Sequence, residues 1–354
     1  MKTKKHFGLY IFLTFLISII YISLAAKPLT TEHNFSPVWK INTSNPVIQP
    51  VTDSKKLKHF HLGQTLGYFD ENGNISLYET FPDKVSISDF YYAIYNSAAK
   101  DTVFYKNDGQ EAGIIEASGF PYFCGNMIYV FLPGGCSFSK CSENGKVLWT
   151  FEGIFPITAF SAKEKYTAVG FSNGSIKILN NETGSTEIDF APGGSELPVI
   201  LGLDISEDGM YVASVSGHNH QRFVLSKREE KQQKIIYHRF FDYDSPYRTA
   251  VHFCNDGQRI FYNFYGGIGI YDITEKTEKI IPMKDKILTI DETDDFVILL
   301  GKEKSSYTLS IIDSTNTLEG SFSFKADTAF VHADKQDIYL GKDNTISRFS
   351  VSKE

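Results

Sequence analysis

One hairpin pattern recurs along this chain. In each copy a short apolar strand runs into a polar turn, and a second strand of alternating apolar and polar residues follows. A chain built from one repeated hairpin buries its apolar faces by stacking the copies against one another. The repeat therefore predicts an all-β fold of similar sheets arranged radially. The five copies read GYFDENGNISLYE from Gly67, VGFSNGSIKILNN from Val169, FYNFYGGIGIYDI from Phe261, LLGKEKSSYTLSIID from Leu299 and YLGKDNTISRFSV from Tyr339.

Residues 57–354 divide into eight units of this kind. Each unit opens with an alternating strand and passes through a turn rich in Gly, Asn or Asp into further strands. In two units the first turn holds an Asp-Gly pair, at 208–209 and 256–257, which supplies the positive φ of a tight hairpin turn. We predict a single β-propeller with eight four-stranded blades; seven blades are the alternative. The units span 57–82, 85–118, 120–153, 156–192, 198–241, 247–282, 286–326 and 327–354.

The last unit has room for three strands only. Propellers usually close the ring by pairing both chain ends in one blade, because this leaves no free sheet edge at the seam. We therefore expect residues 35–42, which include Val38-Trp39-Lys40, to supply the missing strand.

The units resemble the blades of WD-repeat and quinoprotein (PQQ-like) propellers. The segment NGKVLWTFEG, which begins at Asn144, is similar to the last strand of a quinoprotein-type blade, and Trp39 lies in a weaker copy. The resemblance covers nearly all of residues 57–354. No Gly-His and Trp-Asp pair recurs at the repeat spacing, which departs from the strict WD-repeat pattern.

The amino-terminal segment differs in kind from the remainder. Three lysines within the first five residues precede an uncharged stretch that begins at Phe7 and ends at Ala26. A helix of this length spans about 30 Å, the thickness of a bilayer core. We expect an N-terminal transmembrane helix acting as a signal anchor; a signal peptide cleaved after the small-x-small site Ser23-Leu24-Ala25 is the alternative. In both cases the remainder is exported, so the propeller lies on the non-cytoplasmic side, periplasmic or extracellular.

These features divide the chain into three segments. Residues 1–26 are the anchor or signal peptide, 27–50 form a tether with one possible blade-closing strand, and 51–354 form the propeller.

The charge balance argues against a nucleic-acid partner. Outside the first 26 residues the chain has 32 Lys and Arg against 42 Asp and Glu, a net charge of −10 with neutral His. An acidic domain lacks the basic surface with which proteins bind nucleic acids or anionic lipids.

Export would permit disulfides among the four cysteines. Cys136 and Cys141 flank Ser-Phe-Ser-Lys, where facing strands of a hairpin would bring the sulfurs together; two free thiols are the alternative. Cys124 and Cys254 fall in units that are not neighbours, so buried, inert thiols are expected there.

Histidines are the remaining candidates for chemistry. His218 and His220 in Gly-His-Asn-His are weak metal-ligand candidates, and a polar surface turn is the alternative. His59, His61, His252 and His332 fall in first strands, which line the central channel of a propeller, so they are candidates for convergence on its axis.

The sequence contains no H-E-x-x-H or G-x-x-x-x-G-K motif, and its G-x-S-x-G match, Gly170 to Gly174, falls in the turn of a repeated hairpin rather than in a strand-to-helix elbow. We therefore predict no catalytic or cofactor-binding residue, no cofactor, and a non-enzymatic scaffold in the cell envelope that binds a protein partner. The resemblance points the same way, because exported bacterial propellers include a scaffold of outer-membrane assembly; this chain lacks that protein's lipidation Cys and its repeated Trp endings. The alternative is a propeller enzyme or a cofactor or metal binder with its site in the central channel.

Overall fold

The computed structural model describes residues 7–25, 33–49, 56–96 and 99–353, in two compact units. The smaller unit comprises residues 1–36 and 351–354 and includes helix α1 (Phe7–Ala25). Within the described ranges, no helix has both the length and the apolar character needed to cross a membrane, so the structure does not support the expected transmembrane helix. The three lysines, Ala26 and residues 27–32 and 50 of the expected tether lie outside the described residues.

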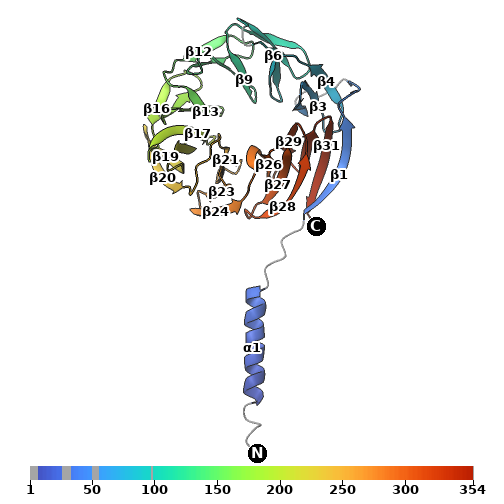
Figure 1. Ribbon diagram of the computed structural model, residues 1–354, viewed down its shortest axis with the longest axis vertical. Coiled ribbons are helices and arrows are strands. Elements are labelled where there is room, and N and C mark those ends of the chain that lie inside the picture. Colours follow the sequence, from blue (N-terminus) through green and yellow to red (C-terminus); the bar gives the residue numbers. More distant parts are fainter. Residues whose placement is uncertain (1–6, 26–32, 50–55, 97–98, 354) are drawn as a thin grey trace, which may run out of the picture. The chain divides into compact units, whose positions relative to one another are not determined.

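The larger unit, residues 37–350, is a ring of eight antiparallel sheets, the blades (Figure 1). Blades 1 to 4 are β2 (Lys58–Leu62), β3 (Thr65–Phe69) and β4 (Ile75–Thr80); β5 (Lys84–Ile87), β6 (Tyr91–Tyr95), β7 (Thr102–Lys106) and β8 (Glu111–Ile115); β9 (Phe120–Cys124), β10 (Met127–Phe131), β11 (Phe138–Cys141) and β12 (Val147–Phe151); and β13 (Ile157–Ala162), β14 (Tyr166–Phe171), β15 (Ile176–Asn180) and β16 (Thr186–Phe190).

Blades 5 to 8 are β17 (Leu197–Ile205), β18 (Tyr211–His218), β19 (Arg222–Glu229) and β20 (Gln232–Phe240); β21 (Val251–Phe253), β22 (Arg259–Phe264), β23 (Gly267–Asp272) and β24 (Thr277–Pro282); β25 (Lys286–Glu292), β26 (Phe296–Glu303), β27 (Ser306–Asp313) and β28 (Leu318–Lys325); and β29 (Ala329–Asp334), β30 (Asp337–Lys342), β31 (Thr345–Lys353) and β1 (His33–Asn42).

The prediction of an all-β propeller with eight blades is confirmed, and the seven-blade alternative is wrong. Each of the five repeated hairpins forms the second and third strands of a blade. Blade 1 is the exception to the expected four strands, because β2, β3 and β4 are its only strands in the described chain. At its outer edge Ile48 forms a single parallel bridge with Ile75, and the backbone N–H of Gln49 donates to the carbonyl of Ile75.

The core lies in the middle strands of the blades, because neighbouring blades cover both of their faces. Strand β26 is buried from Phe296 to Gly301 and reads as a nearly continuous apolar run, as expected for a doubly covered strand. The outer strand β28 is mostly exposed. Between blades 5 and 6 the rings of Phe223 and Tyr262 stack with centroids 3.9 Å apart. The ring of Tyr262 occupies the space that a Cβ atom at Gly269 would need, so this glycine is required for the packing.

Strand β1 closes the ring. It pairs with β31 as the outer strand of blade 8, so segments near the two ends of the chain share one sheet (Figure 1). The strand expected over residues 35–42 is thereby confirmed.

Trp39 of β1 connects this seam to blade 1. Its indole N–H donates to the carbonyl of Glu71 at 2.9 Å, and its ring lies against Phe69 and Tyr339, with centroids 6.1 and 6.0 Å away. Trp149 of outer strand β12 makes the same kind of contact with blade 4, donating to the carbonyl of Asn181 at 3.0 Å. The sequence similarity between the two Trp segments thus corresponds to a similar interblade role.

The ring has two faces that differ in their loops. Because the strands of a blade alternate in direction, the turns between first and second strands lie on one face, which we call the first-turn face. In blades 2 to 8 these turns are 88–90, 125–126, 163–165, 206–210, 254–258, 293–295 and 335–336. In the three-stranded blade 1 the turn 63–64 lies beside the linker 81–83 instead, since the N–H of Phe81 donates to the carbonyl of Gln64. The connections between blades lie on the other, the linker face, at 81–83, 116–119, 152–156, 191–196, 241–250, 283–285 and 326–328.

Trp39→Ala should lower the free energy of unfolding by about 2–3 kcal/mol, because it removes a half-buried indole and its hydrogen bond at the seam. Val38→Ala is the matched control, since Val38 neighbours Trp39 in β1 and is 49% exposed; it should change stability by less than about 0.5 kcal/mol. Denaturant unfolding measures both, and equal effects would argue against closure through Trp39.

Candidate functional site

Buried carboxylates on the first-turn face connect neighbouring blades. Asp204, at the end of β17 in blade 5, is 6% exposed. Its carboxylate accepts the hydroxyl of Ser161 in blade 4, the N–H of Ile205 in its own blade, and the N–H of Phe253 in blade 6 at 2.8 Å. One side chain therefore fixes the relative position of three blades.

Asp291 plays a similar part between blades 7 and 8. It accepts the N–H of Glu292 and the N–H of Ala333 in β29, both at 2.9 Å. Burial raises the pKa of Asp291 even though these two backbone donors favour the ionised form.

A histidine cluster, His59, Asp89 and His332, lies where blades 8, 1 and 2 meet. Nδ1 of His59 is 2.7 Å from Oδ1 of Asp89, and the same oxygen accepts the His59 N–H at 3.0 Å. Nε2 of His332 lies 2.8 Å from the carbonyl oxygen of His59, and the two imidazole centroids are 4.5 Å apart. Burial and the neighbouring His59 lower the pKa of His332. Burial alone would raise the pKa of Asp89, but the hydrogen bonds and charge of His59 outweigh it and hold that pKa well below its usual value.

A second cluster lies between blades 6 and 7 and consists of His252, Cys254 and Glu292. Oε1 of Glu292 is 3.0 Å from Nε2 of His252 and accepts the N–H of Asn255 at 2.9 Å. Cys254 is 3% exposed, and its burial raises the thiol pKa far above the usual value. This keeps the sulfur in the protonated, unreactive form.

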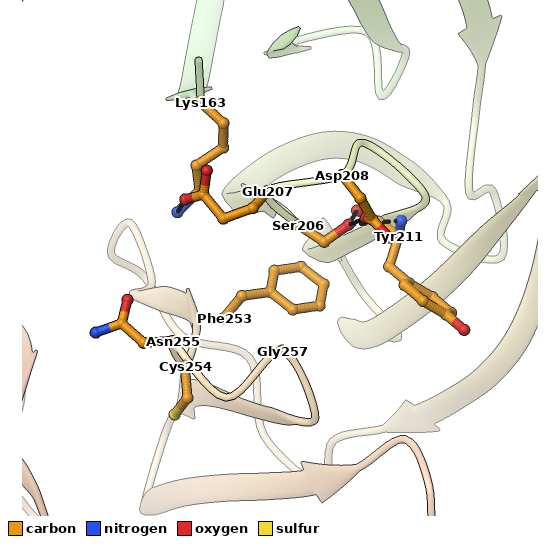
Figure 2. A pocket seen from close by; sticks show the side chains of 9 residues that line it. All are labelled: Lys163, Ser206, Glu207, Asp208, Tyr211, Phe253, Cys254, Asn255 and Gly257. Carbon is orange, nitrogen blue, oxygen red and sulfur yellow. Dashed lines mark hydrogen bonds and ion pairs between the residues drawn. The ribbon is translucent and has the colours of Figure 1, made fainter. Parts of the chain in front are cut away.

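A pocket of about 240 Å³ opens beside the second cluster, between the first turns of blades 4, 5 and 6 (Figure 2). Lys163 and Glu207 stand at one side of it with their charged groups 3.2 Å apart, and Phe253, Cys254 and Asn255 form the other. The pocket could hold a small polar molecule. Its two charged groups already neutralise each other, and Lys163 also lies 4.0 Å from Asp204.

The structure brings together some of the predicted histidines and leaves others apart. His59 and His332 meet, whereas His252 belongs to the separate cluster described above. The ring of His61 lies against Phe81 and its Nε2 against the carbonyl of Gly63.

The Gly-His-Asn-His segment ends strand β18 and begins the turn to β19. Asn219 and His220 both have positive φ, and the N–H of Asn219 donates to Asp244 in the linker that follows blade 5. Neither His218 nor His220 belongs to a group of metal-ligating side chains within the described chain.

The candidate disulfide between Cys136 and Cys141 is not formed, and all four cysteines are free. Cys136 lies in the turn before β11 and Cys141 at the far end of that strand, rather than on facing strands. The residues of β11 between them span about 10 Å, which is too far for a disulfide. Burial raises the pKa of the Cys141 thiol to about 11. Cys124 is half-buried, and Cys254 is buried as described.

The linker face carries exposed apolar side chains. Between blades 3 and 4, Ile154 is 87% and Phe155 45% exposed, and they border a groove of about 450 Å³ with Phe151 and Phe171. Further around the ring, the exposed residues are Leu197, Tyr243, Tyr247 and Tyr265.

Sequence reasoning missed the acidic members of both clusters. Asp89 and Glu292 each stand at or beside a first turn, where a single acid is usually solvated, and their partners come from another blade. The one available signal was the position of acids at the end of first strands, as in Asp204 and Asp291.

The comparisons with known proteins agree with this architecture. A family model described as beta-propeller protein matches residues 1–353. The chain belongs to this beta-propeller family. An uncharacterized protein of Treponema pallidum (strain Nichols) is 24% identical to it, over 99% of this chain and 96% of the relative.

Solved propellers share the fold at low identity. BamB from Moraxella catarrhalis matches 90% of this chain and 100% of its own, with a TM-score of 0.61 and 12% identity. The computationally designed Ika8 protein matches 86% of this chain and 99% of its own, with a TM-score of 0.61 and 13% identity. A chain of the mitotic checkpoint complex matches 93% and 96%, with a TM-score of 0.55 and 11% identity. These similarities cover both the quinoprotein-like and the WD-repeat propellers that the sequence resembles, and they show the fold.

Asp204→Ala should lower the free energy of unfolding by about 2–3 kcal/mol, because it leaves the N–H of Phe253 without its acceptor between two blades. Glu207→Ala is the control from the adjoining turn, since that side chain is 72% exposed; its effect should stay below about 0.5 kcal/mol. Urea unfolding of the two variants gives the comparison. Similar losses would contradict a special role for Asp204.

Asp89→Asn should destabilise the protein at pH 7 by about 1–2 kcal/mol, and the difference from wild type should shrink as the pH falls through about 4. The pKa of Asp89 is depressed in the folded protein. Its stabilising contribution is therefore present above the unfolded-state pKa and is lost on acidification. Unfolding curves at a series of pH values test this, and a difference that does not vary with pH would contradict it.

Proposed function

We propose that this protein is a non-enzymatic, exported propeller that serves as a protein–protein interaction scaffold in the cell envelope. The observation that carries the proposal is the group of exposed apolar side chains on the linker face. Exposed apolar groups are common singly, but their concentration on one face of a soluble domain favours a docking surface.

These exposed side chains extend along the linker face from blade 3 to blade 6. Ile154 and Phe155 stand at one end beside the 450 Å³ groove, which offers a pocket for an apolar anchor of a partner. At the other end the rings of Tyr243 and Tyr265 lie 6.2 Å apart and are 69% and 59% exposed. Tyrosine and other aromatic side chains are enriched at protein interfaces because they combine a large contact area with a polar tip.

The linker 241–250, which carries Tyr243 and Tyr247, is fixed by hydrogen bonds. The amide of Gln221 contacts Ser245 from both sides, donating to its carbonyl and accepting its N–H, and Gln221 is fully buried. Asp244 accepts the backbone N–H groups of Asn219 and Gln221. A preorganised loop loses less conformational entropy when it binds, which favours recognition of a folded partner.

Export is the second part of the proposal. It rests on the three lysines that precede the uncharged apolar segment. The mass of the mature protein and its distribution between membrane and soluble fractions test this part. A cleaved amino terminus identifies a signal peptide, an intact one in the membrane fraction an anchor, and an intact chain in the cytoplasm contradicts export.

A small-molecule site is the second candidate function, favoured by the pocket beside Lys163 and Glu207. We rank it below the scaffold because the charged groups of that pocket pair with each other and its Cys254 thiol is buried. A propeller enzyme or cofactor binder would require a group in the pocket that is free to act on a substrate.

Crosslinking in intact cells, followed by identification of the bound proteins, tests the scaffold. Ile154→Asp combined with Phe155→Ser should reduce recovery of a specific partner at least tenfold, which corresponds to about 1.4 kcal/mol of binding free energy. The melting temperature should be unchanged because both side chains are exposed.

The matched control is Val147→Ser combined with Leu148→Asp, which alters two exposed apolar residues of outer strand β12 in the same blade. This variant should recover the partner as wild type does. Equal recovery with all three proteins would rule out the linker face as the docking surface.

A further inference from the structure

The histidine cluster unites three potential metal ligands from three different blades. His332 comes from β29 of blade 8, His59 from β2 of blade 1 and Asp89 from the first turn of blade 2. One ligand atom of each lies within 4.8 Å of the other two. We propose that His59, Asp89 and His332 bind a divalent transition-metal ion of the zinc type, and that the ion joins these three blades beside the seam of the ring.

The dimensions fit such an ion with small adjustments. Ligand atoms bound to zinc at 2.0–2.2 Å in tetrahedral geometry lie about 3.3–3.6 Å apart. Nδ1 of His59 and Oδ1 of Asp89 are now 2.7 Å apart, joined by a hydrogen bond. Binding replaces that hydrogen bond with two metal–ligand bonds, and the His59 ring then carries its proton on Nε2.

The ligand types select the class of metal. Two imidazoles and one carboxylate suit zinc and other first-row divalent ions, whereas calcium and magnesium prefer all-oxygen sites. Three protein ligands leave a coordination position for water.

The turn that carries Asp89 is held by hydrogen bonds of its own. The side chain of Asn107 donates to the Asp89 carbonyl at 2.7 Å, and the Ser88 hydroxyl donates to the carbonyl of Gly125 at 2.9 Å. Such supporting contacts orient metal ligands before the ion arrives. The side chains of His59 and Asp89 are 26% and 31% exposed, so an ion can reach them from solvent.

Lys58 is expected to compete with a bound metal ion for the Asp89 carboxylate. Its Nζ lies 3.6 Å from Oδ2 of Asp89 and 3.7 Å from Oδ2 of Asp334. The ammonium competes with a cation for Asp89, so its removal should strengthen metal binding. A purely structural ion-pair network would show no such gain.

The second cluster provides a control, because it contains the same kinds of residue in a less suitable arrangement. Its third member is the sulfur of Cys254, which is only 3% exposed, in place of a second imidazole. His61 provides another control, because it lies two residues from His59 in the same strand while its ring contacts Phe81.

The test titrates Zn²⁺ into the purified full-length chain after treatment with a chelator, using calorimetry and the shift in melting temperature. Wild type should bind one ion and melt at a higher temperature in its presence. His332→Ala, Asp89→Asn and His59→Gln should each weaken binding at least tenfold. His59→Gln keeps a polar side chain at its position, so it remains informative if His332→Ala folds poorly. His61→Ala and His252→Ala should bind as wild type, and Lys58→Met should bind more tightly.

Co²⁺ provides an independent readout, since a site with imidazole ligands gives a visible absorption band on binding that His332→Ala should abolish. Three outcomes would overturn the proposal: no saturable binding to wild type, binding that survives unchanged in the ligand variants, or loss of binding in His252→Ala instead. The partner experiment above does not depend on this result, so the two can fail separately.

Discussion

Closure of the ring is the constraint on which this structure depends. Each blade covers its apolar faces with the two neighbouring blades, and this works for every blade only if the last blade meets the first. The pairing of β1 with β31 provides that junction, and Trp39 extends it into the turn of blade 1 around Glu71. Without it, blades 8 and 1 would expose apolar faces, and β31 would present an unpaired strand edge to solvent.

The two faces of the closed ring have different properties. On the first-turn face, Asp204, Asp291 and Asp89 accept backbone N–H groups of neighbouring blades, so the carboxylates act as hydrogen-bonded crosslinks in partly buried surroundings. On the linker face, loops of up to ten residues carry exposed apolar side chains. The first face therefore suits ions and small polar groups, and the second suits a protein surface. Both faces are free to carry such groups because apolar contacts between the middle strands of neighbouring blades, and not apolar side chains on the faces, hold the ring together.

Most of the fold could be predicted from the sequence. The expected unit 286–326 corresponds to strands that begin at Lys286 and end at Lys325, and the expected closing strand 35–42 lies within β1. Repeated hairpins can be recognised from short stretches of sequence, since hydrophobic alternation and turn residues are properties of neighbouring positions. The three-stranded blade 1 was not predicted, because the region before β2 has no strand pattern of its own. The disulfide expected from the spacing of Cys136 and Cys141 is absent, since both residues border the same strand instead of facing strands.

The sequence by itself determined the class of fold and the strand that closes the ring, and it favoured eight blades over seven, because hydrophobic alternation and turn chemistry act over a few residues. Only the tertiary structure decided which polar side chains meet. His59 and His332 are 273 positions apart in the chain and touch because blades 8 and 1 are neighbours in the closed ring. The same reason separates His252 from them and joins it to Glu292. Contacts of this kind depend on which blades are neighbours in the ring and on the register of each first strand. Neither can be predicted from a short stretch of sequence.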